Sequence, residues 1–159
     1  MALQVRRVVT GHDAAGRAGV LSDGALTNVT SRRPAHEAAV IWTTQGYPVS
    51  NDGSDDPSAV EIGSTVKDGT VFRIVSYGPG CAPRRHRTAS IDYAVVMSGE
   101  IDMELDGGET VHLKAGDVLV QRGTVHNWVN NGAEACVIAF VLIDAKPVEA
   151  GGWVLRAEG

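Results

Sequence analysis

HRTASIDYAVVM, the stretch of residues 86–97, decides the fold of this chain. In an extended strand successive side chains point to opposite faces, so every second residue shares a face. One face of this strand therefore begins with an unbroken series of polar side chains: His86, Thr88, Ser90 and Asp92. The strand continues as the apolar run AVVM, so this polar face belongs to a hydrophobic strand rather than to a solvated loop. Polar groups in such a place need hydrogen-bond partners or a function.

Strand-length runs rich in β-branched residues recur on both sides of this stretch. They are VRRVV (5–9), GVL (19–21), AVIWTT (39–44), VFRIVSY (71–77), IDMEL (101–105), DVLV (117–120) and CVIAFVLI (136–143). Asp106-Gly107 supplies the positive φ of a tight hairpin turn, and the acidic segment NDGSDDPS (51–58) reads as an exposed loop. Helical periodicity is weak, and its best candidate, AHEAAVIW (35–42), runs into β-branched residues. We therefore predict an all-β sandwich or barrel.

A second polar face occurs in TVHNWVN, residues 124–130, where alternation places His126 and Trp128 on the same side. Two histidines and a carboxylate, His86, His126 and Asp92, then converge if the two strands are neighbours. Imidazole nitrogen and carboxylate oxygen suit a first-row divalent metal, and such a set leaves positions open for water or substrate. Without metal, the same groups suit acid and base catalysis.

Length and composition exclude several classes of protein. A chain of 159 residues buries one core, so we predict a single domain over residues 1–159. The net charge of -5 argues against a nucleic-acid binder, and no apolar run approaches the ~20 residues of a membrane span. The start of the chain lacks the pattern of a secretory signal, so we expect a cytoplasmic protein. Cys81 and Cys136 have no metal-ligand spacing, and we expect no nucleotide cofactor.

The spacing of the first segment resembles the first motif of the cupin superfamily, G-x5-H-x-H-x3-E-x6-G. The alignment runs from Gly80 through His86 to Gly99, and every interval is kept. Two ligand positions differ, because Thr88 replaces the second histidine and Asp92 replaces the glutamate.

The second segment resembles the other cupin motif, G-x5-P-x-G-x2-H-x3-N. It aligns from Gly116 through His126 to Asn130 and is one residue shorter before the histidine. Arg122 stands where the family usually has proline. The strings HRTxSxDY and QRGTxHxWxN look like a subtype of small microbial and fungal cupins.

This resemblance implies a double-stranded β-helix, or jelly-roll, barrel with the site in its mouth. Residues 70–145 would form the barrel core and residues 1–60 additional N-terminal strands, and the protein is expected to be a homodimer. The expected catalytic residues, which are also the expected ligands of a divalent metal (Fe, Mn, Zn or Ni), are His86, Asp92 and His126. The expected substrate-binding residues are Thr88, Ser90, Trp128 and Arg122.

Two questions stay open at the level of sequence. Thr88 marks either a three-ligand metal site or a cupin that has lost its metal, and in the second case His86, Asp92 and His126 act as acid and base or as pocket residues. The function is either that of an enzyme on a small, partly apolar organic molecule or that of a non-catalytic small-molecule binder. Lyase, isomerase, dehydratase and dioxygenase reactions all fit the enzyme interpretation, because fold does not fix function.

Overall fold

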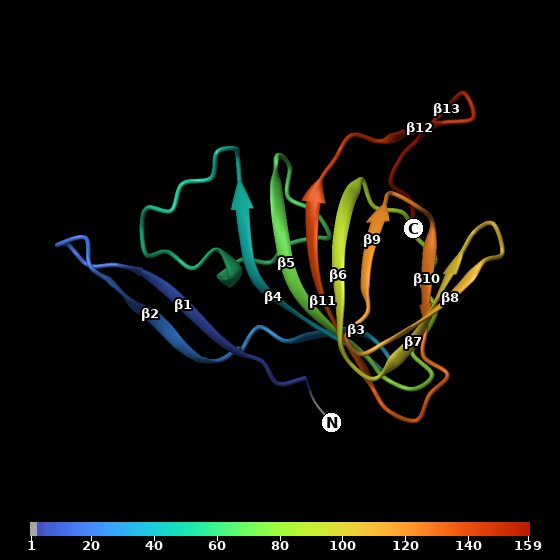
Figure 1. Ribbon diagram of the computed structural model, residues 1–159, viewed down its shortest axis with the longest axis horizontal. Helices are drawn as coiled ribbons and strands as arrows, with labels where there is room; N and C mark the ends of the chain where they lie inside the picture. The colour runs from blue at the N-terminus through green and yellow to red at the C-terminus, as the bar shows by residue number, and fades with distance from the viewer. Residues whose placement is uncertain (1–2) are drawn as a thin grey trace.

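The computed structural model describes residues 3–159, and over these residues the chain is built from β-strands joined by turns and loops (Figure 1). The strands are β1 (Arg6–His12), β2 (Ala18–Ala25), β3 (Thr30–Arg33), β4 (His36–Gln45), β5 (Gly69–Tyr77), β6 (Ser90–Ser98), β7 (Glu100–Leu105), β8 (Thr110–Lys114), β9 (Val118–Arg122), β10 (His126–Val129), β11 (Cys136–Asp144), β12 (Val148–Ala150) and β13 (Trp153–Leu155). A single 3-10 turn, η1 (Pro57–Ala59), lies between β4 and β5. Within the described part of the chain, no helix has the length and apolar character needed to cross a membrane.

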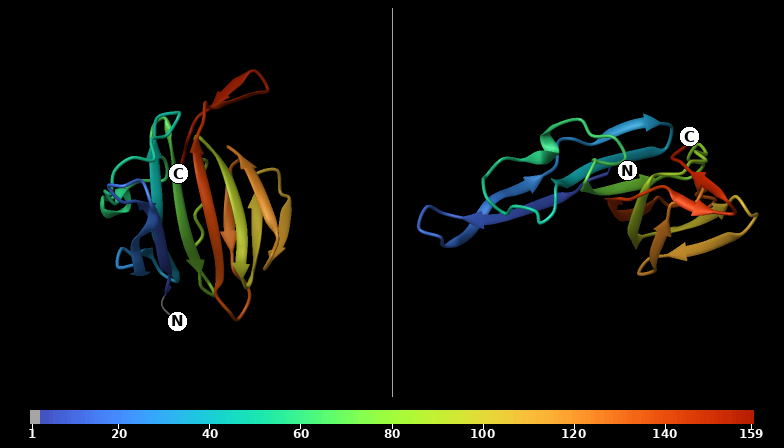
Figure 2. Two further views of the ribbon diagram at one scale, coloured as in Figure 1. Left: turned by 60° about the vertical axis from the view of Figure 1, so that its left-hand side comes forward. Right: turned by 90° about the horizontal axis from the view of Figure 1, so that it is seen from above.

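Two antiparallel sheets form the barrel. The larger has the strand order β3-β4-β5-β11-β6-β9, and the smaller has the order β10-β7-β8. The sheets curve towards each other, with the smaller sheet closing over one face of the larger (Figure 2). The hairpins β1-β2 and β12-β13 are separate two-stranded sheets, and β1-β2 projects away from the barrel (Figure 1). The all-β jelly-roll barrel with additional N-terminal strands is therefore confirmed.

The segment with the best helical periodicity, residues 35–42, forms no helix: Ala35 lies in a turn with φ of +54°, and residues 36–42 are extended and form most of β4. Its residues pair with β5, from His36 opposite Tyr77 to Gln45 opposite Gly69. The β-branched residues in the second half of β4 favour a strand, and the ladder to β5 satisfies the backbone groups that a helix would have paired internally.

The space between the sheets is filled by alternate side chains of the long strands. The buried apolar side chains of this core include Val71 and Val75 on β5, and Ile138, Phe140 and Leu142 on β11, with Trp128 on β10. A smaller cluster covers the outer face of the large sheet, where Leu3 and Val5 pack against Ala39 and Ile74. The inner cluster determines which side chains of each strand face the cavity described below.

Gly99 shows why the first motif ends in glycine. It lies between β6 and β7 with φ of +73°, a left-handed conformation that side chains disfavour. A Cβ atom there would lie 2.6 Å from the carbonyl oxygen of Ala135. The glycine therefore lets β6 turn directly into β7 against the segment that leads into β11.

Candidate active site

His86 and His126 face each other across a short antiparallel bridge. The N–H of His86 donates to the carbonyl of His126 at 3.1 Å, and the N–H of His126 donates to the carbonyl of His86 at 3.0 Å. The centroids of the two imidazole rings are 4.3 Å apart. This backbone pairing brings together two residues that lie 40 positions apart in the sequence and holds their side chains on the same face.

Each imidazole is fixed by a backbone carbonyl two residues earlier. Nδ1 of His86 lies 2.9 Å from the carbonyl oxygen of Arg84, and Nδ1 of His126 lies 3.0 Å from that of Thr124. A carbonyl only accepts, so Nδ1 carries the hydrogen and Nε2 keeps its lone pair in the neutral ring. Burial lowers the pKa of His126 to about 4 and also lowers the pKa of His86. Both rings are therefore neutral acceptors at pH 7.

Asp92 lies on β6 and is buried, at 4% exposure. Ser90 Oγ donates to Asp92 Oδ1 at 2.5 Å and lies 2.8 Å from Thr88 Oγ1. Burial raises the pKa of Asp92, while the Ser90 hydrogen bond and the positive charge of Arg73 act in the opposite direction. Burial dominates, so the protonated carboxyl is favoured relative to a solvated aspartate.

These groups line one cavity, which we call the main cavity and which has a volume of about 770 Å³. His86, Thr88, Asp92, His126 and Trp128 all contribute to its wall. Strands β5 and β11 supply an apolar surface that includes Val75, Phe140 and Leu142, and Leu142 is the direct cross-strand neighbour of Asp92. Strand β4 and segments 27–33 and 58–64 also contribute to the lining. Trp128 is both cavity wall and core, because it is 3% exposed and its ring packs edge to face on Phe140.

Two predicted substrate-binding residues lie elsewhere. Ser90 and Arg122 line a second cavity of about 810 Å³, which we call the side cavity, together with Gln121 and Lys146. Thr88 lines both cavities. Arg122 is exposed on β9, and alternation along that strand points it away from the buried Gln121. Ser90 reaches the site through its hydrogen bond to Asp92 rather than by facing the main cavity.

Of the three expected metal ligands, His86 and His126 fit a metal site but Asp92 does not lie in one group with them. The free Nε2 atoms of His86 and His126, each held by a carbonyl on the other ring nitrogen, have the form that metal-binding histidines take. Asp92 does not join them in one ligand group: among residues 3–159 no three His, Cys, Asp or Glu side chains are arranged to hold an ion together. The three-ligand centre therefore stays a prediction.

Sequence reasoning missed several basic residues of the main cavity, among them Arg33, His36 and Arg73. His36 is half-buried on β4, and its ring packs edge to face on Tyr77 with the ring centroids 5.5 Å apart. Arg73 carried a signal in the sequence: it shares the face of Val71 and Val75, so alternation along VFRIVSY places it among inward side chains.

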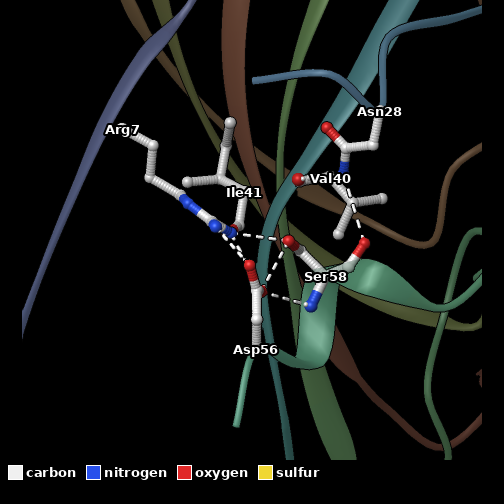
Figure 3. Close-up of polar contacts among 6 residues, drawn as sticks. All are labelled: Arg7, Asn28, Val40, Ile41, Asp56 and Ser58. Atoms are coloured by element: carbon white, nitrogen blue, oxygen red, sulfur yellow. Dashed lines mark hydrogen bonds and ion pairs between the residues drawn. The ribbon is translucent and has the colours of Figure 1, made fainter. Parts of the chain in front are cut away.

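A cluster of polar side chains holds η1, at the start of the lining segment 58–64, against β4 (Figure 3). Arg7 on β1 donates to the carbonyl of Ile41 at 3.0 Å and to Ser58 Oγ at 2.5 Å, and it forms an ion pair with Asp56. Asn28 donates to the carbonyls of Val40 and Ser58 at 2.9 and 3.2 Å. We call Arg7, Asn28, Asp56 and Ser58 the latch, because these side chains tie η1 and the following lining segment to β4.

Comparison with known proteins finds the cupin domain family over residues 73–143 of this chain. A cupin-domain-containing oxidoreductase of Aspergillus ruber is 37% identical over 156 residues, covering 94% of this chain and 77% of that protein. Phomopsin biosynthesis cluster protein D of Diaporthe leptostromiformis is 40% identical over 158 residues, covering 94% of this chain and 83% of that protein. Among solved structures, KdgF from a Halomonas species is similar with a TM-score of 0.50 at 18% identity, covering 72% of this chain and 84% of that chain. The last likeness concerns the fold alone.

Proposed function

Because this chain belongs to the cupin-domain family, we propose that it is an enzyme that transfers a proton on a small, partly apolar organic substrate bound in the main cavity. The observation that carries the proposal is the pair of neutral imidazoles, whose Nε2 atoms are free while Nδ1 is held by a carbonyl. They line the same cavity as the buried carboxyl of Asp92. The reaction belongs to the lyase or isomerase type.

In the proposed step, Nε2 of His126 accepts a proton from a substrate carbon next to a carbonyl group. The C–H bond breaks, its electron pair stays on the substrate, and the imidazole becomes an imidazolium. Asp92, whose burial favours the carboxylic acid, donates its hydrogen to the atom on which negative charge develops. Ser90 holds the carboxyl in place, and the rings of Trp128 and Phe140 exclude water from the reacting atoms.

Solvent-deuterium exchange into a panel of small carbonyl compounds, followed by NMR, tests this proposal. We expect His126→Gln and Asp92→Asn to reduce the exchange rate by at least ~100-fold, as removal of a general acid or base does. His112→Gln is the matched control, because His112 is exposed on β8 and outside both cavities. Binding of compounds without any exchange or turnover by the wild type would overturn the proposal and favour a non-catalytic binder.

An oxidoreductase is a second candidate, because relatives from Aspergillus ruber and Hypocrea virens carry that name. The two free Nε2 atoms would hold a divalent metal, which would supply redox or Lewis-acid chemistry when bound. Metal analysis of the purified protein and of His86→Ala separates the candidates. Stoichiometric metal that is lost in the variant and is needed for turnover favours the oxidoreductase, whereas full activity after chelation favours proton transfer.

A further inference from the structure

Two guanidinium groups in the main cavity, those of Arg33 and Arg73, have buried nitrogen atoms without a hydrogen-bond partner. Arg33, at the end of β3, has Nε and Nη1 buried without a hydrogen-bond partner, and Arg73 on β5 has a buried, unpartnered Nε. Neither belongs to any ion pair in the described part of the chain. The Nη2 of Arg73 is held by the carbonyl of Gly63, which fixes the direction of the side chain.

The acids that line the same cavity do not satisfy these groups. Glu61 is paired with Arg32 at 2.7 Å on the exposed rim. Asp92 accepts from Ser90 and lies beyond ion-pair distance of Arg73. A buried charged donor without an acceptor is costly, so the cavity as it stands is suited to receive an anion.

A third unpartnered group lies beside the arginines. Nδ1 of His36 is buried without a hydrogen-bond partner, and the charges of Arg33, Arg84 and Arg73 all act on this ring. The two charged groups with unpartnered nitrogens, Arg33 and Arg73, therefore come from β3 and β5, and the neutral ring of His36 comes from β4 between these strands. The aromatic rings of Trp128 and Phe140 come from β10 and β11. Phe140 is the direct cross-strand neighbour of Arg73, so an aromatic ring lies beside this guanidinium on the same sheet.

We propose that Arg33 and Arg73 bind the carboxylate of an organic acid whose apolar part packs on Trp128 and Phe140. The guanidinium fork matches the two oxygens of a carboxylate, and a monoanion costs less to desolvate between two sheets than a phosphate dianion. This inference rests on the proposed function, since it names the class of substrate on which His126 and Asp92 act. The carboxylate on the arginines directs the rest of the molecule towards the imidazole pair.

Isothermal titration with benzoate and its neutral isostere benzamide tests the inference. We expect the wild type to bind benzoate at least tenfold more tightly than benzamide, and this preference to weaken with added salt. Arg33→Gln and Arg73→Gln should each abolish the preference, whereas Arg85→Gln, an exposed arginine outside both cavities, should keep it. Equal affinity of the wild type for both compounds would overturn the inference without recourse to any variant, and tighter binding of phenyl phosphate would overturn the choice of carboxylate.

These experiments distinguish a failure of the carboxylate site from a failure of the proposed enzyme activity. His126→Gln should bind benzoate like the wild type, because the imidazole does not hold the carboxylate. Benzoate selectivity without proton exchange on any acid leaves the carboxylate site standing and removes the proposed enzyme activity. Proton exchange on neutral carbonyl compounds, with no preference for benzoate over benzamide, supports the proposed enzyme activity and removes the carboxylate site.

Discussion

At the scale of the residue, His36 gives the cavity a measurable pH dependence. Burial, together with the charge of Arg33, lowers its pKa to about 4 from an ordinary value of 6.5. Between these values the unfolded chain binds a proton at His36 and the folded chain does not, so the free energy of unfolding falls as the pH falls from 6.5 to 4. We expect His36→Gln to reduce the proton uptake on unfolding by up to one, measured from denaturant midpoints across that pH range.

His112 is the control, because folding raises its pKa whereas folding lowers the pKa of His36. Its hydrogen bond to Asp102 raises its pKa, so its contribution is present at low pH and is lost as the pH rises through that pKa. His112→Gln should therefore change the pH dependence of stability only above pH 6.5, whereas His36→Gln makes the loss of stability between pH 6.5 and 4 shallower. The interpretation of His36 is wrong if His36→Gln leaves the slope between pH 6.5 and 4 unchanged, or if His112→Gln changes that slope as much.

Single residues also show how far sequence reasoning reaches. Strand parity correctly grouped Asp92 with Thr88, because a strand has a strict period of two. Parity did not reveal that Ser90 would line a different cavity from Asp92, since the boundary between the cavities depends on how β9 and the chain end pack. The unpartnered state of Arg33 and Arg73 was equally out of reach, because it depends on which acids fail to meet them in space.

At the scale of the element, the latch determines how firmly η1 and segment 58–64 line the cavity. Arg7 is largely buried and contacts three groups on two elements. We expect Arg7→Gln to lower the free energy of unfolding by about 1–3 kcal/mol, the cost of leaving buried polar partners unsatisfied. Amide hydrogen exchange should quicken over segment 58–64, and benzoate affinity should fall because Gly63 positions Arg73.

The neighbouring arginine is a matched control for the latch. Arg6 forms an ion pair with Asp23 at 2.7 Å, but both side chains are exposed, at 72% and 42%. Arg6→Gln should leave the free energy of unfolding nearly unchanged and leave the exchange of the cavity lining unaltered, because an exposed ion pair is screened by solvent. Equal effects of the two substitutions would show that the latch does not order the segment.

The elements themselves were predictable to different degrees. The runs that became β5, β6, β7, β9 and β11 were visible, because local composition favours one conformation there. The hairpin between β7 and β8 was also visible, but the positive φ lies at Gly108 and not at Asp106-Gly107. The position of the β1-β2 hairpin was not visible, because β2 is exposed along its whole length and shows no buried face. The latch joins residues 49 positions apart, a contact that no local pattern encodes.

At the scale of the whole molecule, the outer face of the large sheet is covered only in part. Leu3 and Val5 cover it over β4 and β5, but its continuation over β6 and β9 exposes a row of large apolar side chains: Tyr93, Val95, Met97, Val118 and Val120. Tyr93 stands opposite Val120 and Val95 opposite Val118, so these side chains form one patch. A patch continuous with a covered face suits a second copy of this chain.

We expect the wild type to form a homodimer in sedimentation velocity across a concentration series, and Val95→Glu to be monomeric. Val111→Glu is the control, because Val111 is also exposed but lies on β8 of the other sheet. A wild type that stays monomeric at the highest concentration, or equal behaviour of the two variants, contradicts this use of the patch.

The contact between Ser90 and Asp92 has a consequence for repeated turnover. Ser90 lines the side cavity, which reaches the surface beside the exposed Arg122 and Lys146, whereas Asp92 lines the main cavity. After Asp92 has given its proton to a substrate in the main cavity, its carboxylate is therefore still linked to the side cavity through the hydroxyl of Ser90. In the proposed reaction the carboxylate of Asp92 regains a proton through Ser90 from the side cavity, and His126 releases its proton to the product or to solvent. Both groups then return to their starting states for the next cycle.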